Sequence, residues 1–142
     1  MKKFLITGGG GYIGSMLSTE LVNLGHEVTV IDQLKYDKGS LDHLYFNKNF
    51  KLINKDIRDL KTLNQYINKN EFIIPLAALV GAPLCEKNKK EAVSVNLDII
   101  KKILTNLNTN NKLIYLTTNS GYGIGEKDRY CDEKSSLRPI SL

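Results

Sequence analysis

The feature that most constrains the fold is a glycine-rich segment near the amino terminus, set between two short apolar runs. The first run, residues 4–6, has no polar alternation, which is typical of a strand buried on both faces of a parallel sheet. Four consecutive glycines, Gly8–Gly11, end that strand, and apolar side chains then recur at helical spacing from Ile13 onward. Gly25 stands at a helix C-cap position, and a second run ends in Asp32. The segment predicts a strand, a turn, a helix and a strand in succession.

This succession suits a dinucleotide. A glycine turn lets a diphosphate approach the backbone closely, and the N-terminus of the next helix offers unpaired N–H groups and the positive end of a dipole. A carboxylate at the end of the second strand can accept both hydroxyls of an adenosine ribose. The glycines lie between a strand and a helix, with Asp32 at the distance that the motif requires. The alternative is a tight turn that binds nothing.

Composition sets the broad class of protein. A chain of 142 residues with 42% hydrophobic content is long and apolar enough for one globular domain. No apolar run approaches the roughly 18 residues that a membrane helix needs. The chain enters its first strand directly, so we expect no signal peptide, no membrane partner and a cytoplasmic location. Cys85 and Cys131 form no Cys-x-x-Cys pair, so we expect free thiols and no metal site.

The formal net charge of +5 raises the question of nucleic-acid binding. The densest lysine cluster, Lys87, Lys89 and Lys90, is flanked by Glu86 and Glu91. No aromatic side chains interleave with this cluster to stack on bases. We therefore interpret the lysines as a solvated surface and expect no nucleic-acid partner.

Strand and helix patterns alternate along the rest of the chain. Apolar runs predict further strands over 50–53, 72–76 and 113–116. Pro75 should lie at the end of its strand, because proline lacks the N–H that a sheet ladder uses. This alternation predicts an α/β fold with a doubly wound parallel sheet of about five strands. The ligand crevice of such a sheet lies beyond the carboxyl ends of its strands.

The intervening segments predict helices and loops. Apolar spacing allows a short helix near 41–45 and predicts one over 60–67 and a long one over 92–107, after a loop at 79–90. No linker marks a second domain. We assign residues 1–125 to the dinucleotide-binding domain and residues 126–142 to a polar tail.

Several segments, in the same order along the chain, resemble those of one family. Thr7 to Gly14 resembles the TGxxGxxG loop of extended short-chain dehydrogenases/reductases. Within that superfamily the chain resembles the NAD-dependent epimerase/dehydratases that act on nucleotide sugars. The resemblance implies a Rossmann-type fold, NAD as cofactor and a nucleotide-sugar substrate in the complete protein. The cofactor-binding residues that it implies are Gly8, Gly10, Gly11, Tyr12, Ile13, Gly14, Asp32, Asp56, Ile57, Leu76, Ala77, Ala78, Asn96 and Thr117.

Some of these positions have competing interpretations. Asp32 favours NAD over NADP, since a carboxylate there repels a 2′-phosphate and no arginine stands beside it. By resemblance, Thr118 is the catalytic residue that hydrogen-bonds the reacting sugar hydroxyl, but it could instead satisfy its own backbone at a strand end. Asp56 could cap the helix that begins at residue 60, or the turn before it. Asn96 could be a solvent-facing helix residue, and Tyr122 is interpreted as a packing residue.

Two departures from the family pattern limit the expected chemistry. Sugar dehydratases of the family have an Asp-Glu pair just after the threonine, where this chain has Asn119 and Ser120, so dehydration is disfavoured. The family's catalytic Tyr-x-x-x-Lys motif follows a segment that resembles residues 139–142, and its tyrosine would be the next residue. We expect the fold to be incomplete at its C-terminal side. Residues 1–142 alone should bind NAD with little or no turnover.

Four interpretations fit these residues. The N-terminal portion of an epimerase would expose an apolar flank where the next helix and strands pack. An NAD-sensing module would instead be stable without them. A split enzyme would have its C-terminal half on a separate polypeptide, and a truncation or gene remnant would have no partner. In the family, the counterpart of the helix at 92–107 builds a dimer interface, so the resemblance implies association of two copies there.

Overall fold

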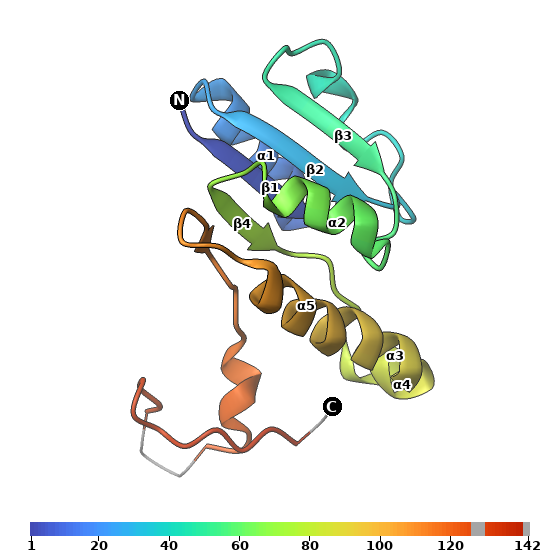
Figure 1. Cartoon of the computed structure of the whole chain (residues 1–142). Coiled ribbons are helices and arrows are strands. Elements are labelled where there is room, and N and C mark those ends of the chain that lie inside the picture. Colours follow the sequence, from blue (N-terminus) through green and yellow to red (C-terminus); the bar gives the residue numbers. More distant parts are fainter. Residues whose placement is uncertain (126–129, 141–142) are drawn as a thin grey trace.

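The computed structural model describes residues 1–125 and 130–140, so the predicted tail at 126–142 lies partly outside the described residues. Its centre is a sheet with the strand order β3-β2-β1-β4-β5, in which every neighbouring pair is parallel. The order reverses between β1 and β4, and α/β sheets bind ligands at such a switch point. The predicted doubly wound parallel sheet is confirmed. The strands are β1 (Lys3–Thr7), β2 (Glu27–Asp32), β3 (Phe50–Asn54), β4 (Phe72–Pro75) and β5 (Lys112–Leu113) (Figure 1).

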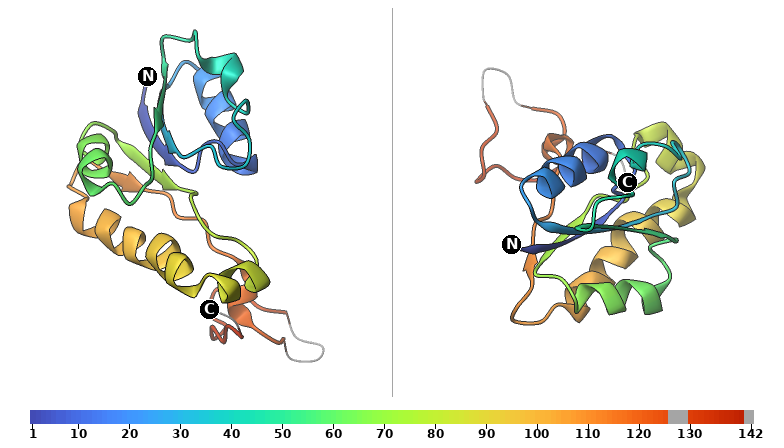
Figure 2. Two further views of the ribbon diagram at one scale, coloured as in Figure 1. Left: turned by 90° about the vertical axis from the view of Figure 1, so that its right-hand side faces the viewer. Right: turned by 90° about the horizontal axis from the view of Figure 1, so that it is seen from above.

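Helices cover both faces of the sheet (Figure 2). Helix α1 (Tyr12–Asn23) lies on one face, and α2 (Leu60–Ile67) and α5 (Ile99–Asn106) lie on the other. The buried side chains of the α1 face are Phe4, Ile6, Val22, Val28, Val30, Leu34, Leu41, Leu44 and Ile74. Those of the opposite face are Leu5, Ile31, Ile57, Leu63, Tyr66, Ile67, Ile73, Val95, Ile99 and Ile103.

The two core layers explain the unbroken apolar run of β1. Successive side chains of a strand point to opposite faces of the sheet, so Leu5 enters one layer and Ile6 enters the other. Both side chains are fully buried. Gly25, just after α1, has a φ of +79°, which suits the predicted C-cap glycine.

The segment from 79 to 107 is more helical than its sequence pattern predicts. Helices α3 (Ala82–Lys87) and α4 (Lys89–Val93) replace most of the loop predicted over 79–90. A π-helical segment, η2 (Ser94–Asp98), then interrupts the single helix predicted over 92–107 and leads into α5. Pro83 favours a loop when the sequence is considered alone, but proline is well suited to the first turn of a helix, where it lies in α3. A π segment inserts an extra residue per turn, so apolar spacing cannot reveal it.

Smaller differences occur at two other predicted elements. Residues near 41–45 form only a short 3-10 turn, η1 (Asp42–Leu44), in place of a helix. Strand β5 ends at Leu113, although a strand is predicted over 113–116, and only the Ile114 N–H extends the ladder, to the Ile73 carbonyl at 3.0 Å. The predicted strand end at Pro75 is confirmed.

An apolar flank follows β5. Ile114, Tyr115 and Leu116 are 44%, 52% and 45% exposed, although a strand pattern predicts burial. Among the described residues the chain then leads away from the sheet rather than back over it (Figures 1 and 2). The exposed flank that we predict for a portion of a larger fold is therefore present.

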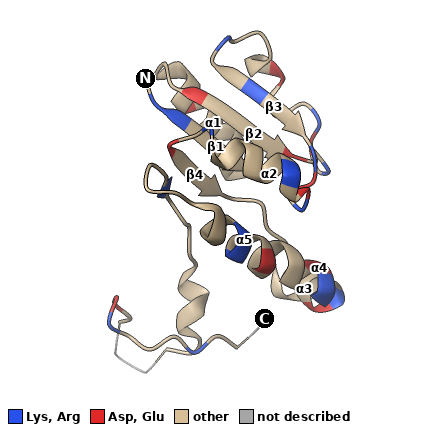
Figure 3. Ribbon diagram, viewed as in Figure 1, with Lys and Arg blue, Asp and Glu red and all other residues tan. Residues whose placement is uncertain are grey.

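The surface carries both signs of charge. Lysines and acidic residues lie interspersed on the surface helices and loops (Figure 3) and form pairs such as Lys2–Glu71 and Lys3–Glu27. Cys85 is buried and Cys131 is exposed, and both are free thiols. Over 1–125 and 130–140, no helix is both long and apolar enough to cross a bilayer. The same residues hold no group of three or more His, Cys, Asp or Glu side chains that could bind a metal.

Candidate cofactor-binding site

The loop between β1 and α1 requires glycine at two positions. Gly8 has a φ of +74°, and a Cβ added there would lie 2.4 Å from the Ala77 backbone nitrogen. A Cβ on Gly14 would lie 2.4 Å from the Gly8 carbonyl oxygen. The loop therefore packs directly on the chain that leaves β4, and α1 packs directly on the loop. No side chain at these positions leaves that packing intact.

The N-terminus of α1 is open to a ligand. Gly11 is its N-cap and supplies no side-chain hydrogen bond. The first bond of the helix runs from the Ser15 N–H to the Gly11 carbonyl at 2.9 Å. The N–H groups of Tyr12, Ile13 and Gly14 therefore have no acceptor within the helix, and the helix dipole adds partial positive charge. This arrangement can bind a diphosphate.

Asp32 lies at the carboxyl end of β2, beside that loop. Its Oδ2 accepts a hydrogen bond from the Gly10 N–H at 2.9 Å, and its Oδ1 accepts one from the Leu34 N–H at 2.7 Å. The carboxylate is thus fixed in place by the backbone on both sides. Each carboxylate oxygen has a further lone pair, so the group can still accept two ribose hydroxyls.

A crevice runs along the carboxyl ends of the strands. One pocket of about 150 Å³ lies between the loops that follow β1, β2, β3 and β4, and a second of about 500 Å³ lies at the N-terminus of α1. The two share Gly8, Gly11, Tyr36 and the Leu76–Ala78 segment. Together they form an elongated site with the glycine loop in its middle. Every predicted cofactor residue except Thr117 lines at least one of these two pockets.

Thr117 and Thr118 follow β5 and lie apart from the crevice lining. The Thr118 hydroxyl accepts a hydrogen bond from the Ser120 N–H at 3.3 Å and lies 3.0 Å from the Ser120 hydroxyl. It thereby caps a 3-10 turn, η3 (Asn119–Tyr122). These contacts favour the local backbone role over the catalytic one. Tyr122, in the same turn, is half-buried.

Asp56 belongs to the turn before α2. Its Oδ1 accepts a hydrogen bond from the Arg58 N–H at 2.8 Å, and its carboxylate pairs with the Arg58 guanidinium. The cap of α2 is Asp59, whose Oδ1 accepts from the Thr62 N–H at 3.2 Å. The alternative that Asp56 caps this helix is therefore wrong, and it stabilises the preceding turn. Its hydrogen bond with the Arg58 side chain lowers the pKa of Asp56.

This pKa shift predicts a pH-dependent contribution of Arg58 to stability. Because folding lowers the pKa of Asp56 below its ordinary value of 3.8, the pair stabilises the fold above that value and loses its effect as the pH falls through the lowered pKa. Arg58→Gln should therefore reduce the free energy of unfolding at about pH 6 and have a smaller effect at about pH 3. Urea unfolding at both pH values measures this.

Lys61→Gln is the matched control, because it removes another positive charge nearby, on α2. It should change stability little at either pH. An Arg58→Gln effect of equal size at both pH values would contradict the role assigned to this pair.

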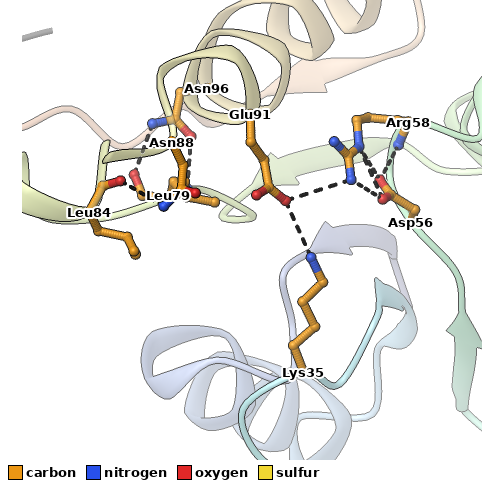
Figure 4. A network of polar contacts seen from close by, with 8 residues as sticks. All are labelled: Lys35, Asp56, Arg58, Leu79, Leu84, Asn88, Glu91 and Asn96. Atoms are coloured by element: carbon orange, nitrogen blue, oxygen red, sulfur yellow. Dashed lines mark hydrogen bonds and ion pairs between the residues drawn. The ribbon is translucent and has the colours of Figure 1, made fainter. Parts of the chain in front are cut away.

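Asn96 ties η2 to the chain that leaves β4. Its Oδ1 accepts a hydrogen bond from the Leu79 N–H at 2.8 Å, and its Nδ2 donates one to the Leu79 carbonyl at 2.9 Å (Figure 4). Both polar atoms of the side chain bond the Leu79 backbone, so the alternative of a solvent-facing residue is wrong. Because Leu76–Ala78 lines both pockets, Asn96 shapes the crevice through its backbone contacts.

Removal of the Asn96 amide should be costly. Asn96→Ala leaves the N–H and the carbonyl of Leu79 without their partner, and we expect a loss of about 1–3 kcal/mol in the free energy of unfolding. Asn106→Ala is the control, since the Asn106 amide bonds the Lys102 carbonyl within its own helix. Urea unfolding should rank the two variants in this order, and equal losses would contradict the role of Asn96.

Other residues at the crevice have no sequence signal. Tyr36 is 84% exposed and lines both pockets. Glu91, which the sequence places in a solvated lysine-rich segment, lies 3.3 Å from the Lys35 ammonium and 3.7 Å from the Arg58 guanidinium. These partners are distant in sequence, so no local pattern connects them. Only the fold brings them together.

A Tyr-x-x-x-Lys spacing does occur in the chain, at Tyr130 and Lys134. The motif works through residues one helical turn apart on the same helix face. Here the backbone over 130–134 is not helical, and Tyr130 is 97% exposed. The spacing therefore does not produce the shared face.

The strand order, the glycine loop and the carboxylate after β2 define a Rossmann-type α/β domain. A model of the NAD dependent epimerase/dehydratase family matches residues 4–142. The chain belongs to this family. The resemblance seen in the sequence is thereby confirmed.

The three nucleotide-sugar enzymes that follow are similar to this chain, and the chain spans less than half the length of each. The UDP-N-acetyl-alpha-D-glucosaminuronate decarboxylase of Bacillus cytotoxicus is 34% identical over 96% of this chain and 44% of that protein. The structure of the UDP-Glc/GlcNAc 4-epimerase from Campylobacter jejuni has a TM-score of 0.86 and 26% identity, over 99% of this chain and 44% of that one. The structure of the UDP-glucose 4-epimerase of Thermus thermophilus, in complex with NAD, has a TM-score of 0.82 and 25% identity, over 98% of this chain and 45% of that one.

Proposed function

We propose that the chain binds NAD in this crevice, as the cofactor-binding portion of a nucleotide-sugar epimerase or related oxidoreductase. The observation that carries the proposal is the Asp32 carboxylate, fixed by the Gly10 and Leu34 N–H groups beside the open N-terminus of α1. A diphosphate needs that helix end, and an adenosine ribose needs that carboxylate. Membership of an NAD-dependent family and likeness to an NAD-bound epimerase support the same cofactor.

The residues present fit NAD along the length of the crevice. The N–H groups of Tyr12–Gly14 would hold the diphosphate, and Asp32 would hold the adenosine ribose. Ile57 and Leu76 supply apolar walls for the adenine, and Asp56 lies at the same end. The larger pocket, lined by Asn96, Tyr115 and Leu116 among others, would receive the nicotinamide end. When bound, NAD supplies the hydride acceptor for oxidation of a sugar carbon.

We propose further that residues 1–142 alone turn over little or no sugar nucleotide. General acid–base catalysis requires a group within hydrogen-bond reach of the proton that it moves. Tyr130 and Lys134 lie in non-helical backbone, and the Thr118 hydroxyl is engaged with Ser120. Asn119 and Ser120 offer no carboxylate for dehydration. In a complete protein the reaction would be epimerisation or oxidoreduction of a nucleotide sugar.

The exposed flank separates this proposal from an NAD-sensing module. A self-contained sensor would cover Ile114, which lines neither crevice pocket and is 44% exposed. This exposure favours a portion of a larger fold, completed either in the same protein or by a separate C-terminal half. Association of two copies through the helical segment at 92–107 is a further proposal, supported by the exposure of Leu97 and Leu104 at 46% and 52%.

Two readouts test the proposal. Titration of the isotopically labelled chain with NAD should shift the amide resonances of Gly10, Gly11 and Ile57, and shifts confined to residues outside the crevice would contradict the site. Incubation with NAD and either UDP-glucose or UDP-N-acetylglucosamine should give no epimer by chromatography. Robust turnover would contradict the expected inactivity while leaving the NAD site intact.

A further inference from the structure

A group of four charged side chains lies at the ribose end of the crevice (Figure 4). Glu91, on α4, lies 3.3 Å from the Lys35 ammonium and 3.7 Å from the Arg58 guanidinium, and Arg58 also pairs with Asp56. Lys35 belongs to the loop after β2, and Arg58 to the loop after β3. One glutamate thus engages the cations of two separate loops.

Three of these four charged side chains lie on the wall that a dinucleotide ribose would face. Lys35, Asp56 and Glu91 line the same pocket as Asp32. Lys35 is also close to Asp32 in sequence. It follows Leu34, whose N–H donates a hydrogen bond to the Asp32 carboxylate. A phosphate on the ribose would therefore meet Lys35, provided that this cation were free to reach it.

We infer that Glu91 contributes to cofactor selectivity, because it engages Lys35 and so withholds that cation from a 2′-phosphate. This inference rests on the proposed NAD site. Asp32 repels a 2′-phosphate directly, whereas Glu91 removes the positive charge that would offset this repulsion. The pocket lining carries Asp32, Asp37, Asp56 and Glu91 against Lys35 and Lys55. The site therefore disfavours a dianionic substituent through several residues rather than through one.

The size of the effect follows from exposure. The side chain of Glu91 is 34% exposed and that of Lys35 is 52% exposed, so solvent screens both. One unit charge acting across several ångströms of partly screened space changes an affinity by about three- to tenfold. The released Lys35 ammonium interacts mainly with the 2′-phosphate, which NAD lacks. The affinity for NADP should therefore change far more than the affinity for NAD.

The test compares NAD and NADP dissociation constants for the 142-residue chain and its Glu91→Gln variant at low ionic strength. We expect the ratio of NADP to NAD affinity to rise by about three- to tenfold, and to rise less as salt is added. Addition of Lys35→Gln to Glu91→Gln should abolish most of this gain, because it removes a released cation. An unchanged ratio in Glu91→Gln would overturn the inference.

Glu86→Gln is the matched control. Glu86, on α3, pairs with Lys89 of α4 and is absent from the lining of both crevice pockets. It should leave the cofactor ratio unchanged, and an equal gain in this variant would also overturn the inference. If the unmodified chain binds neither cofactor, the proposed function itself fails. If it binds NAD and Glu91→Gln leaves the ratio unchanged, only the selectivity role fails.

Discussion

Replacement of Asp32 with alanine is expected to weaken NAD binding by about a hundredfold or more. The carboxylate would accept two ribose hydroxyls, and hydrogen bonds to a charged group contribute about 1.5–3 kcal/mol each. A loss of about 3 kcal/mol corresponds to roughly a hundredfold in the dissociation constant. The variant also leaves the N–H groups of Gly10 and Leu34 without their acceptor, which loosens the loop that shapes the site. Calorimetric titration with NAD measures the change.

Asp37→Ala is the control for this variant. Asp37 lines the same pocket, but its Oδ1 accepts a hydrogen bond from the Gly39 N–H at 2.8 Å within its own turn. It has the same charge as Asp32, so the pair separates a specific contact from a general change in charge. We expect less than about a threefold effect from Asp37→Ala. Equal NAD affinity in Asp32→Ala and the unmodified chain would contradict the assigned role of Asp32.

A Gly8→Ala substitution should have the largest effect on stability. Its φ of +74° is unfavourable for a residue with a Cβ, and that Cβ would lie 2.4 Å from the Ala77 nitrogen and 2.6 Å from the Ala77 Cα. Both contacts are with backbone, so no side chain can move aside. We expect a loss of about 3 kcal/mol or more in the free energy of unfolding. Urea unfolding measures it.

Gly25→Ala isolates the conformational part of that cost. Gly25 has a similar φ of +79°, but an added Cβ would meet nothing within 4 Å. Its substitution should cost only about 1–2 kcal/mol, the penalty of a left-handed backbone alone. If Gly8→Ala proved no more destabilising than Gly25→Ala, the close packing of the glycine loop on Ala77 would be wrong.

The parts of the fold that sequence predicts are those with a local physical cause. The run at 4–6 is apolar because β1 is buried on both faces, and Pro75 ends β4 because it has no N–H to donate. Asp32 is recognisable because a fixed spacing links it to the glycine loop. These features do not depend on which distant residues are in contact, so the local sequence is enough to predict them.

The parts that sequence does not predict depend on contacts between distant residues. Glu91 reads as one more charge in a lysine-rich segment, and its role appears only when the loops holding Lys35 and Arg58 lie beside it. Likewise, residues 114–116 have the composition of a strand, but β5 ends at Leu113. The cap of α2 is different, because Asp59 immediately precedes the helix and so has a local signal in the sequence that Asp56 lacks.

The central claim, a working NAD site in this chain, is tested most directly by calorimetric titration of the unmodified protein with NAD and with NADP. We predict saturable binding of one NAD per chain and clearly weaker binding of NADP, because Asp32 and Glu91 both act against a 2′-phosphate. Absence of binding heat for either cofactor, at concentrations where the chain remains folded, would contradict the claim.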